Sequence, residues 1–327
     1  MSAPVCKLSV VCPAFNEEEV LPRFHAELCA VLDPLRREYE VEILYVDDGS
    51  RDGTLEVLRR LAAGDARVRY LSFSRNFGHQ AALTAGLEHA RGDVVVSMDS
   101  DLQHPPALLP VLLEKWRAGH DLVLTLRQDD PRLSPFKRLS SRAFYRLLRW
   151  LSDTEVRAAA SDFRLMSRKA LDALLRLHET HRFLRGMVNW LGFPTTTVPF
   201  MPASRAGGVS KYTLRRMLTL ALDGMLSFSK VPLRLALLLG ALLFLLGLGA
   251  GAWALARALF AEASGTGVVL TALFLVGGCV LGALGVLGEY VGRIYEQVKG
   301  RPHYLLKEAS PATAAGRPFQ SQPPAAA

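Results

Sequence analysis

Short apolar runs alternate with amphipathic segments from Leu8 to about Asp101. Residues 7–32, 41–63 and 68–90 each begin with an apolar run, continue through a polar turn and end with apolar residues at helical spacing. Residues 92–101 close the series with a further apolar run. Strands that alternate with helices of this length imply right-handed crossovers and a parallel sheet with both faces covered. The pattern therefore predicts an α/β domain.

Each predicted strand ends in a cluster of polar side chains. The clusters are Asn16 with Glu17, Asp47 with Asp48, Arg75 with Asn76, and Asp99 with Asp101. In open α/β sheets, ligands bind beyond the carboxyl ends of the strands. Four such clusters therefore predict a ligand site at this edge of the sheet.

Asp99 and Asp101 follow a strand that is predicted to be buried. Carboxylates at such a position are costly unless a cation compensates them. Two hard oxygen ligands from one short turn suit Mg²⁺ or Mn²⁺, which usually completes its coordination with phosphate and water. Gln103 could reach the same ion or its water. The pair therefore indicates a nucleotide diphosphate, although two aspartates in a turn are also typical of caps and turn formers.

The other strand ends offer hydrogen-bonding groups for a nucleoside. Asp48 is placed to accept hydrogen bonds from a base or a ribose, and Glu17 is placed in the same way. Asp52 fits the cap of the helix that follows it. The chain has neither a GxxxxGK[ST] nor a GxGxxG motif, so P-loop ATPases and dinucleotide oxidoreductases fit poorly.

A second group of segments points to a membrane. After a strand that ends near Arg127, residues 136–151 read as a basic amphipathic helix, which lies either on an anionic membrane or on a solvated protein surface. Leu235–Ala256 and Gly267–Gly288 then each hold about 22 residues without a charge, the length needed to cross a bilayer. Buried core helices are the alternative, but no further domain remains to cover them. We therefore predict two transmembrane helices.

Basic residues flank this pair of helices: Arg215, Arg216, Lys230 and Arg234 before it, and Arg293, Lys299 and Arg301 after it. The positive-inside rule therefore predicts an integral membrane protein whose N-terminal domain and two termini are cytoplasmic. Glycines in both helices allow close packing between them, or mark the contact of a homo-oligomer.

Four parts of the chain follow from these patterns. Residues 1–210 form the α/β domain, and residues 211–232 have the apolar spacing of a helix that lies in the membrane interface, with a core helix as the alternative. Residues 233–290 form the two-helix membrane domain. Residues 291–327 form a cytoplasmic segment whose low-complexity tail we expect to be disordered.

Composition narrows the partners. The chain has 327 residues, a net charge of +8 and a pI near 9.5, which admit nucleic acid, an anionic membrane surface or phosphorylated substrates. Its cysteines, Cys6, Cys12, Cys29 and Cys279, have no metal-ligand spacing, so we interpret them as buried thiols in a reducing compartment.

The ordered motifs "PAFNEEEVL", "VDDGSRDGT", "SRNFGHQAALTAGL", "MDSDLQHPP", "SDFRLMSRKAL" and "RAGGVSKY", ahead of two apolar helices, resemble family 2 glycosyltransferases. The most similar group is the polyprenyl-phosphate glycosyltransferases, which includes dolichyl-phosphate mannose synthases and bactoprenol glucosyltransferases. The resemblance runs from about residue 7 to residue 306. It implies a GT-A fold, a nucleotide-sugar donor, Mg²⁺ or Mn²⁺, and transfer to a polyprenyl phosphate at the lipid bilayer in a bacterial inner membrane, with no nucleic-acid partner.

The resemblance also assigns roles to residues. The nucleoside-binding positions of the family are matched by Pro13, Phe15, Glu17 and Asp48, and the metal and diphosphate positions by Asp99, Asp101 and Gln103. Arg127 matches an arginine that contacts phosphate or acceptor. Asp162 matches an acidic residue proposed as base or acceptor-positioning group. Arg205, Ser210 and Lys211 match a loop that closes over the diphosphate. The chain departs from the family at His104 and Val209, where many relatives are acidic, and at Arg132, which stands for a displaced arginine.

Physical chemistry limits the role of Asp162. A phosphate monoester has its second pKa near 6, so the acceptor is already an anion at neutral pH and needs little help from a base. Asp162 instead positions Arg164 or Lys211, or caps the helix that follows it. The harder task is bringing two anions together, which the metal and the basic side chains of Arg127, Arg205 and Lys211 would allow.

The resemblance favours inverting transfer of a sugar to undecaprenyl or another polyprenyl phosphate, which gives a lipid-linked monosaccharide for cell-envelope glycans. UDP-glucose is the favoured donor, with GDP-mannose or another UDP-sugar as alternatives. A processive polysaccharide synthase is a second hypothesis, but the chain lacks a QxxRW motif and further apolar segments. A catalytically inactive membrane scaffold is the third, and the intact acidic and basic motif residues argue against it.

Overall fold

The computed structural model describes residues 6–128, 160–179, 182–201, 231–260 and 266–311. The chain divides into two compact units. The first joins Met1–Tyr145, Glu155–Thr213 and Gly300–Ala327, and the second joins Arg146–Thr154 and Leu214–Lys299. Each unit is described by itself.

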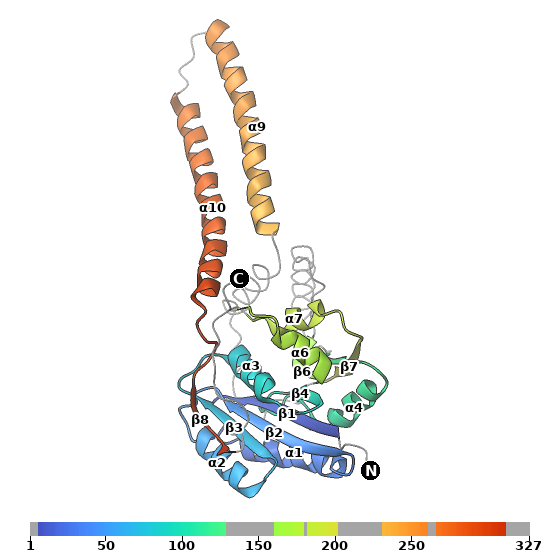
Figure 1. The fold of residues 1–327 in the computed structure, drawn as a ribbon. Helices are drawn as coiled ribbons and strands as arrows, with labels where there is room; N and C mark the ends of the chain where they lie inside the picture. The colour runs from blue at the N-terminus through green and yellow to red at the C-terminus, as the bar shows by residue number, and fades with distance from the viewer. Residues whose placement is uncertain (1–5, 129–159, 180–181, 202–230, 261–265, 312–327) are drawn as a thin grey trace. The chain divides into compact units, whose positions relative to one another are not determined.

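Strands and helices alternate in the first part of the first unit, as predicted (Figure 1). Their bounds are β1 Cys6–Ala14, α1 Leu21–Leu35, β2 Tyr39–Asp47, α2 Thr54–Gly64, β3 Val68–Phe73, α3 His79–His89, β4 Val94–Ser97, the 3₁₀ turn η1 Pro106–Leu108, α4 Leu109–Arg117 and β5 Leu122–Arg127. The later elements of this unit are β6 Ala160–Ser167, α6 Arg168–Leu175, α7 Leu184–Trp190, β7 Thr195–Phe200 and β8 Leu306–Ala309.

The strands form one eight-stranded sheet in the order β7-β5-β6-β4-β1-β2-β3-β8. The pairs β1–β2, β1–β4, β2–β3 and β5–β7 are parallel, which confirms the parallel arrangement predicted for the first four strands. The sheet as a whole is mixed, because β6 runs antiparallel to both β4 and β5, and β8 runs antiparallel to β3. The fold class is therefore α/β with a mixed sheet.

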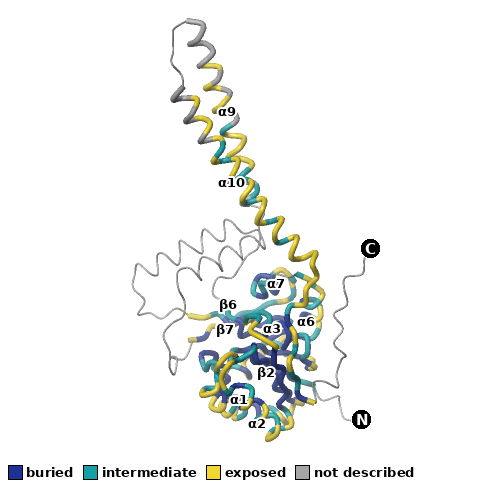
Figure 2. The backbone as a smooth tube through the Cα atoms, turned by 90° about the vertical axis from the view of Figure 1, so that its left-hand side faces the viewer, coloured by how far each residue is buried: buried dark blue, intermediate teal, exposed yellow. Residues whose placement is uncertain are grey.

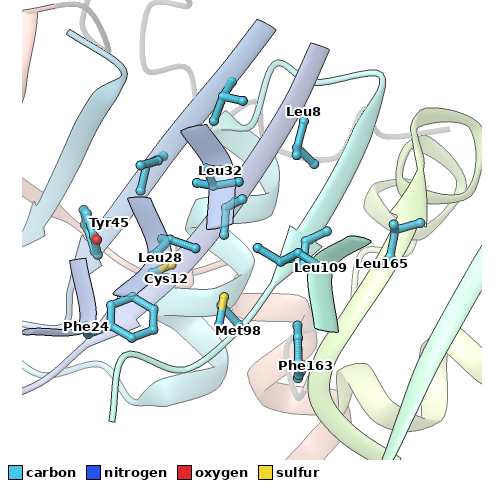
Figure 3. Packing of buried hydrophobic residues seen from close by; sticks show 14 of the residues in the cluster. Leu8, Cys12, Phe24, Leu28, Leu32, Tyr45, Met98, Leu109, Phe163 and Leu165 are labelled. Atoms are coloured by element: carbon cyan, nitrogen blue, oxygen red, sulfur yellow. The ribbon is translucent and has the colours of Figure 1, made fainter. Parts of the chain in front are cut away.

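Helices cover both faces of the sheet. Because alternate side chains along each strand point to opposite faces, each face packs its own set of apolar side chains against helices. One core cluster joins β1, β2 and β4 to α1 and α4, with Leu8, Phe24 and Leu109 fully buried (Figure 3). The opposite face packs on α3 through Leu44, Leu71 and other residues of β2 and β3. The apolar run before Asp99 is completely buried, from Val94 to Val96, as the sequence predicted.

Gly86 lets α3 lie close to β1. A Cβ added at this position would lie 2.2 Å from Cγ1 of Val11. We expect Gly86→Ala to lower the free energy of unfolding by about 1–3 kcal/mol, because the buried valine cannot move aside without repacking. Urea denaturation checks this against Gly64→Ala at the end of α2, where no atom lies within 4 Å of the added Cβ. A Gly86→Ala protein as stable as Gly64→Ala would show that α3 does not need this close approach.

A strand near the C-terminal end of the described chain completes the sheet, which the sequence analysis did not predict. β8 pairs with β3, and Ser310 exchanges hydrogen bonds with the backbone of Tyr70. Tyr304 stacks on Phe73 with ring centroids 4.9 Å apart, and its hydroxyl donates to Glu88 at 2.8 Å. These contacts make residues 304–310 part of the α/β unit.

The second unit contains two long helices, α9 Val231–Phe260 and α10 Thr266–Lys299, which contact each other. Many of their described residues are exposed, as the colour of the tube shows (Figure 2). Within the described part of the chain, no helix combines the length and the apolarity that a bilayer crossing demands. The predicted spans lie inside α9 and α10, and their insertion into a bilayer stays a prediction. Of the predicted interfacial helix, only residues 231 and 232 are described, at the start of α9, and residues 136–151 lie outside the described residues.

Candidate active site

The D-x-D turn is fastened to the end of the central strand β1. Met98 continues β4 by donating its backbone N–H to Val11 at 3.0 Å, and the hydroxyl of Ser100 donates to the carbonyl of Pro13 at 2.8 Å. Met98 is fully buried in the core cluster beside β4 (Figure 3). The core therefore holds the backbone on which Asp99 and Asp101 stand.

Asp99 has a buried carboxylate oxygen that fits a cation. Its Oδ1 atom is buried and accepts no hydrogen bond from the described residues, although Nε2 of His79 lies 3.5 Å away. Buried carboxylate oxygens without a hydrogen bond are rare because they are costly. Asp101 lies two residues along the same turn, so the donor set of hard oxygens suits Mg²⁺ or Mn²⁺.

Gln103 orients Asp101 in this structure. Its backbone N–H donates to Oδ1 of Asp101 at 3.0 Å, and its side-chain amide donates to Oδ2 at 2.7 Å. Leu102 between them has φ of +64°, a conformation that costs free energy for a branched side chain and is concentrated at functional sites. The oxygen of the Gln103 side-chain amide accepts a hydrogen bond from Arg127 at 3.4 Å. Gln103 therefore links the acidic turn to Arg127 at the end of β5.

Asp48 anchors the turn between β3 and α3. Its two oxygens accept from the backbone of Phe77 at 2.8 Å and Gly78 at 3.1 Å, and from the side chain of Asn76 at 2.9 Å. Burial raises the pKa of Asp48, and these hydrogen bonds partly oppose the rise. The carboxylate that was predicted to meet a base or ribose therefore also shapes the loop in front of α3.

The loop after β1 is held against the loop after β2. The backbone N–H of Glu17 donates to the hydroxyl of Thr54 at 2.9 Å, and that of Asn16 donates to Ser50 at 3.0 Å. Asp52 accepts from the backbone N–H of Thr54 at 3.1 Å in the turn ahead of α2, but the N-cap residue of α2 is Gly53, so the predicted capping role of Asp52 is wrong. Phe15, at the start of the loop after β1, is 41% exposed.

Asp162 lies in strand β6, so its interpretation as a helix cap is wrong. Ser167 caps α6 instead, by accepting the backbone N–H of Ala170 at 3.2 Å. Asp162 is 2% exposed and lies among cationic side chains. Arg164 pairs with it from the same strand, and Arg185 of α7 reaches both of its oxygens with contacts of 2.7 and 3.2 Å.

These neighbours set the charge of Asp162. Burial raises the pKa of Asp162, but His79, Arg185 and Arg164 outweigh burial and hold it well below the usual range. His79 lies between the two acidic groups, with Nε2 3.5 Å from Asp162 and 3.5 Å from Asp99. Burial lowers the pKa of His79, but the two carboxylates outweigh it and raise the pKa to about 9. His79 is therefore a cation that links the D-x-D turn to Asp162.

His104 holds the backbone of the D-x-D turn by a hydrogen bond. Its Nδ1 accepts the backbone N–H of Asp99 at 2.9 Å, and its Nε2 lies 2.7 Å from the hydroxyl of Ser161. Its ring stacks on Phe163 at 5.3 Å, and burial lowers its pKa although nearby carboxylates oppose the change. The hydrogen bonds fit a neutral imidazole with its proton on Nε2. His104, at which the chain departs from the family motif, thus supports the backbone of the turn.

Sequence reasoning did not single out three residues of this group: His79, Ser161 and Arg185. His79 stands in the motif "SRNFGHQAALTAGL", which was quoted only as a whole, and Arg185 stands outside the quoted motifs. A basic residue near a turn is not part of any distinctive sequence spacing. The contacts of His79 and Arg185 with Asp162 therefore become visible only in the folded structure. The loop residues Arg205, Ser210 and Lys211, together with Val209 and Arg132, lie outside the described residues.

A second group with metal-ligand atoms lies elsewhere, at His25, Cys29 and Asp65. The guanidinium of Arg67 occupies it, with contacts of 2.6 Å to Asp65 and 3.4 Å to the sulfur of Cys29. A metal ion at this cluster would therefore have to displace Arg67.

The sheet thus carries an acidic turn that suits a divalent cation and a group of cationic side chains beside it, and comparison with known proteins identifies the class of protein. Residues 9–175 match the family model "Glycosyl transferase family 2", and the chain belongs to this family. This confirms the family and the enzyme class expected from the motifs, and the mixed sheet with its covering helices confirms the α/β fold class.

Two relatives cover nearly the whole chain. The uncharacterized glycosyltransferase YkcC of Bacillus subtilis is 41% identical over 92% of this chain and 93% of its own length. The bactoprenol glucosyl transferase of Shigella phage SfII is 40% identical over 93% of this chain and 98% of its own length. Among solved structures, the mannosyltransferase PcManGT from Pyrobaculum calidifontis, in complex with GDP-Man and Mn²⁺, has a TM-score of 0.46 and 19% identity, covering 88% of this chain and 87% of its own.

Proposed function

We propose that this chain transfers glucose from UDP-glucose to bactoprenyl (undecaprenyl) phosphate, with inversion at the sugar carbon. The observation that carries the chemistry is the buried oxygen of Asp99, beside Asp101, which accepts no hydrogen bond from the residues that the structure describes. The choice of acceptor and sugar is supported by relatives named bactoprenol glucosyl transferase that are 39–40% identical over 92–93% of this chain.

Asp99 and Asp101 would hold Mg²⁺ or Mn²⁺, which neutralises the diphosphate that leaves when the sugar is transferred. Gln103 keeps the carboxylate of Asp101 in place and presents Arg127 at the end of β5. Pro13, Phe15, Glu17 and Asp48 would surround the nucleoside, with Phe15 exposed for stacking. Arg205, Ser210 and Lys211 would close over the diphosphate.

The attack of the acceptor phosphate depends more on positively charged side chains around the two substrates than on a general base. Its phosphate is largely ionised at neutral pH. Asp162 is a poor proton acceptor, because two guanidinium groups bind its oxygens. The reaction therefore forms the new bond from an oxygen that is already anionic, and positive side chains reduce the repulsion between the two phosphate-bearing substrates.

We further propose that α9 and α10 insert into the cytoplasmic membrane, with the α/β unit on the cytoplasmic side. The uncharged segments inside these helices and the basic residues at both ends support this orientation. A lipid-linked acceptor would then present its phosphate at the headgroup level. The glycines of the two helices would serve close packing in one chain or in a homo-oligomer.

Transfer of radiolabel from a panel of nucleotide sugars to undecaprenyl phosphate tests the reaction. We expect label in the organic phase from UDP-glucose with Mn²⁺ or Mg²⁺ present, and its loss when EDTA is added. Label from GDP-mannose or another UDP-sugar would correct the donor. Label in an aqueous polymer would favour a polysaccharide synthase, and no transfer by folded protein would refute the assignment.

The pH dependence separates a phosphate nucleophile from a carboxylate base. Because the pKa of Asp162 is well below its usual range, this group stays ionised throughout the neutral range. We expect the rate constant at saturating substrates to be flat above about pH 7 and to fall as the acceptor phosphate is protonated near pH 6. If the rate constant of Asp162→Asn is lower than that of wild type at pH 7 and recovers at higher pH, this result would contradict the expectation and indicate that Asp162 acts as a base.

A further inference from the structure

A histidine, a cysteine and an aspartate meet between α1 and the end of α2, outside the D-x-D turn. His25 and Cys29 lie four residues apart on α1, so their side chains share one face of the helix. Asp65, the C-cap residue of α2, reaches the same face. One ligand atom from each of the three residues lies within 4.8 Å of the others. These three residues are called the His–Cys–Asp cluster below.

The spacing of the ligand atoms fits one tetrahedral zinc ion. Nε2 of His25 lies 3.5 Å from the sulfur of Cys29, and Oδ2 of Asp65 lies 3.9 Å from the same sulfur. Zinc bonds of about 2.3 Å to sulfur and about 2.0–2.2 Å to nitrogen or oxygen place two ligand atoms about 3.5–3.7 Å apart at the tetrahedral angle. The three side chains therefore need little adjustment to hold the metal, and water can supply the fourth ligand.

Neighbouring groups hold two of these ligands in place. The hydroxyl of Tyr45, which is fully buried, lies 3.1 Å from Nδ1 of His25. When Nδ1 carries the proton and donates it to this hydroxyl, Nε2 is left with a lone pair for a metal, and a similar outer hydrogen bond orients most zinc-binding histidines. Oδ1 of Asp65 accepts the backbone N–H of Arg67 at 2.9 Å, which keeps this carboxylate at the end of α2.

A cation already contacts the cluster and has a second partner beside it. The guanidinium of Arg67 lies 2.6 Å from Oδ2 of Asp65 and 3.4 Å from the sulfur of Cys29. It also pairs with Asp33, one turn further along α1, at 2.7 Å. If a metal takes Asp65 and Cys29, Arg67 can keep its pair with Asp33. The displacement of Arg67 from the cluster therefore leaves no guanidinium without a carboxylate.

The charges of these side chains favour the exchange. Without a metal, the single positive charge of Arg67 faces the two carboxylates of Asp33 and Asp65. Cysteine binds a metal as the thiolate and releases its proton to water. The two positive charges of Zn²⁺ would then meet those of the Cys29 thiolate and Asp65, while Arg67 balances Asp33. The metal therefore removes the excess of negative charge within this group.

We propose that His25, Cys29 and Asp65 form a zinc site that is separate from the D-x-D turn. Thiolate and imidazole are softer ligands than the carboxylates of Asp99 and Asp101, so this site selects Zn²⁺ over Mg²⁺ and Mn²⁺. The bound ion joins α1 to the connection between α2 and β3 and stabilises this part of the α/β unit. The site is independent of which sugar and which acceptor the enzyme uses.

Titration of the whole chain in detergent with Co²⁺, and then with Zn²⁺, tests the site. Co²⁺ bound to a thiolate gives a charge-transfer band in the near ultraviolet, which carboxylate ligands alone do not give. We expect this band in wild type, its disappearance when Zn²⁺ replaces Co²⁺, and its absence from Cys29→Ser. Cys6→Ser is the matched control and should keep the band, because Cys6 is also partly buried but lies in β1, outside the cluster.

Zinc affinity, measured by competition with a chromophoric chelator, gives the size of each effect. Cys29→Ser should weaken Zn²⁺ binding at least about tenfold. Arg67→Gln removes the cation that competes for Asp65 and Cys29, so it should tighten Zn²⁺ binding about tenfold. Zn²⁺ at about 100 times its dissociation constant should raise the melting temperature of wild type by about 5–10 °C and leave that of Cys29→Ser unchanged.

Three results would overturn the inference. They are a wild type without the charge-transfer band, a band that survives in Cys29→Ser, and an Arg67→Gln protein that binds Zn²⁺ no more tightly than wild type. If Cys29→Ser melts at a much lower temperature than wild type before metal is added, Arg67→Gln decides the question, because a damaged fold would weaken zinc binding and not tighten it.

Discussion

Asp99→Asn should reduce sugar transfer by at least about 10²- to 10³-fold. The substitution keeps the shape of the side chain but removes the charge of a carboxylate whose Oδ1 accepts no hydrogen bond from the described residues. A metal held by Asp101 alone would neutralise the leaving diphosphate less well, and losing such electrostatic stabilisation costs several kcal/mol of barrier. Initial rates with saturating Mn²⁺ and donor measure the effect. Mn²⁺ affinity, followed by electron paramagnetic resonance, should fall in parallel.

Glu114→Gln is the matched control for Asp99→Asn. Glu114 lies on α4 with a side chain that is 73% exposed, so its loss changes the net charge equally without touching the site. We expect wild-type rates and Mn²⁺ affinity for this variant, and an unchanged melting temperature for both. An Asp99→Asn enzyme with wild-type activity would remove Asp99 from the metal site.

Asp162→Ala should lower the free energy of unfolding by about 3–5 kcal/mol. The substitution leaves Arg164 buried without its carboxylate, and the exposed fraction of that arginine is only 2%. For a unit of this size the loss lowers the melting temperature by roughly 6–20 °C, measurable by thermal denaturation in detergent. The stability that Asp162 contributes is present above the ordinary carboxyl pKa of about 4. It is lost only as the pH falls through the lower pKa of the folded state.

A second substitution separates lost charge balance from lost packing. Asp162→Leu combined with Arg164→Met removes both buried charges, and we expect it to recover more than half of the lost stability. Asp172→Ala on α6 is the control, because its pair with Arg168 at 3.6 Å is partly exposed and contributes under about 1 kcal/mol. A double variant no more stable than Asp162→Ala would show that Arg164 is not what makes the single substitution costly.

The acidic turn could be predicted from sequence because its signal is local. The apolar run from Val94 to Met98 reads as a buried strand, and the side chains that follow it must be at the strand end. The structure places Asp99 and Asp101 there and buries the run completely. The carboxyl ends of parallel strands share one edge, so Asp48 and Glu17 could also be placed.

What the sequence could not show depends on contacts between distant segments. The stretch around Asp162 reads equally well as strand or as helix start, and its pairing with β4 and β5 decides the question. Arg185 and His79 meet Asp162 only because α7 and α3 begin beside β6. β8 is four residues long and partly exposed, so no periodicity distinguishes it from a loop.

The position of β8 in the sheet also limits how many times the chain can cross a bilayer between β7 and β8. β7 and β8 belong to one sheet, although the chain between Phe200 and Leu306 includes both long helices. A strand can join a sheet only on the side of a bilayer where that sheet lies. If α9 crosses a bilayer, the chain would therefore have to cross back before Leu306, since a single crossing would carry Ser310 away from Tyr70. In topological terms the helical pair is an insertion into the catalytic domain, and its two ends are tied to the same side by the sheet itself.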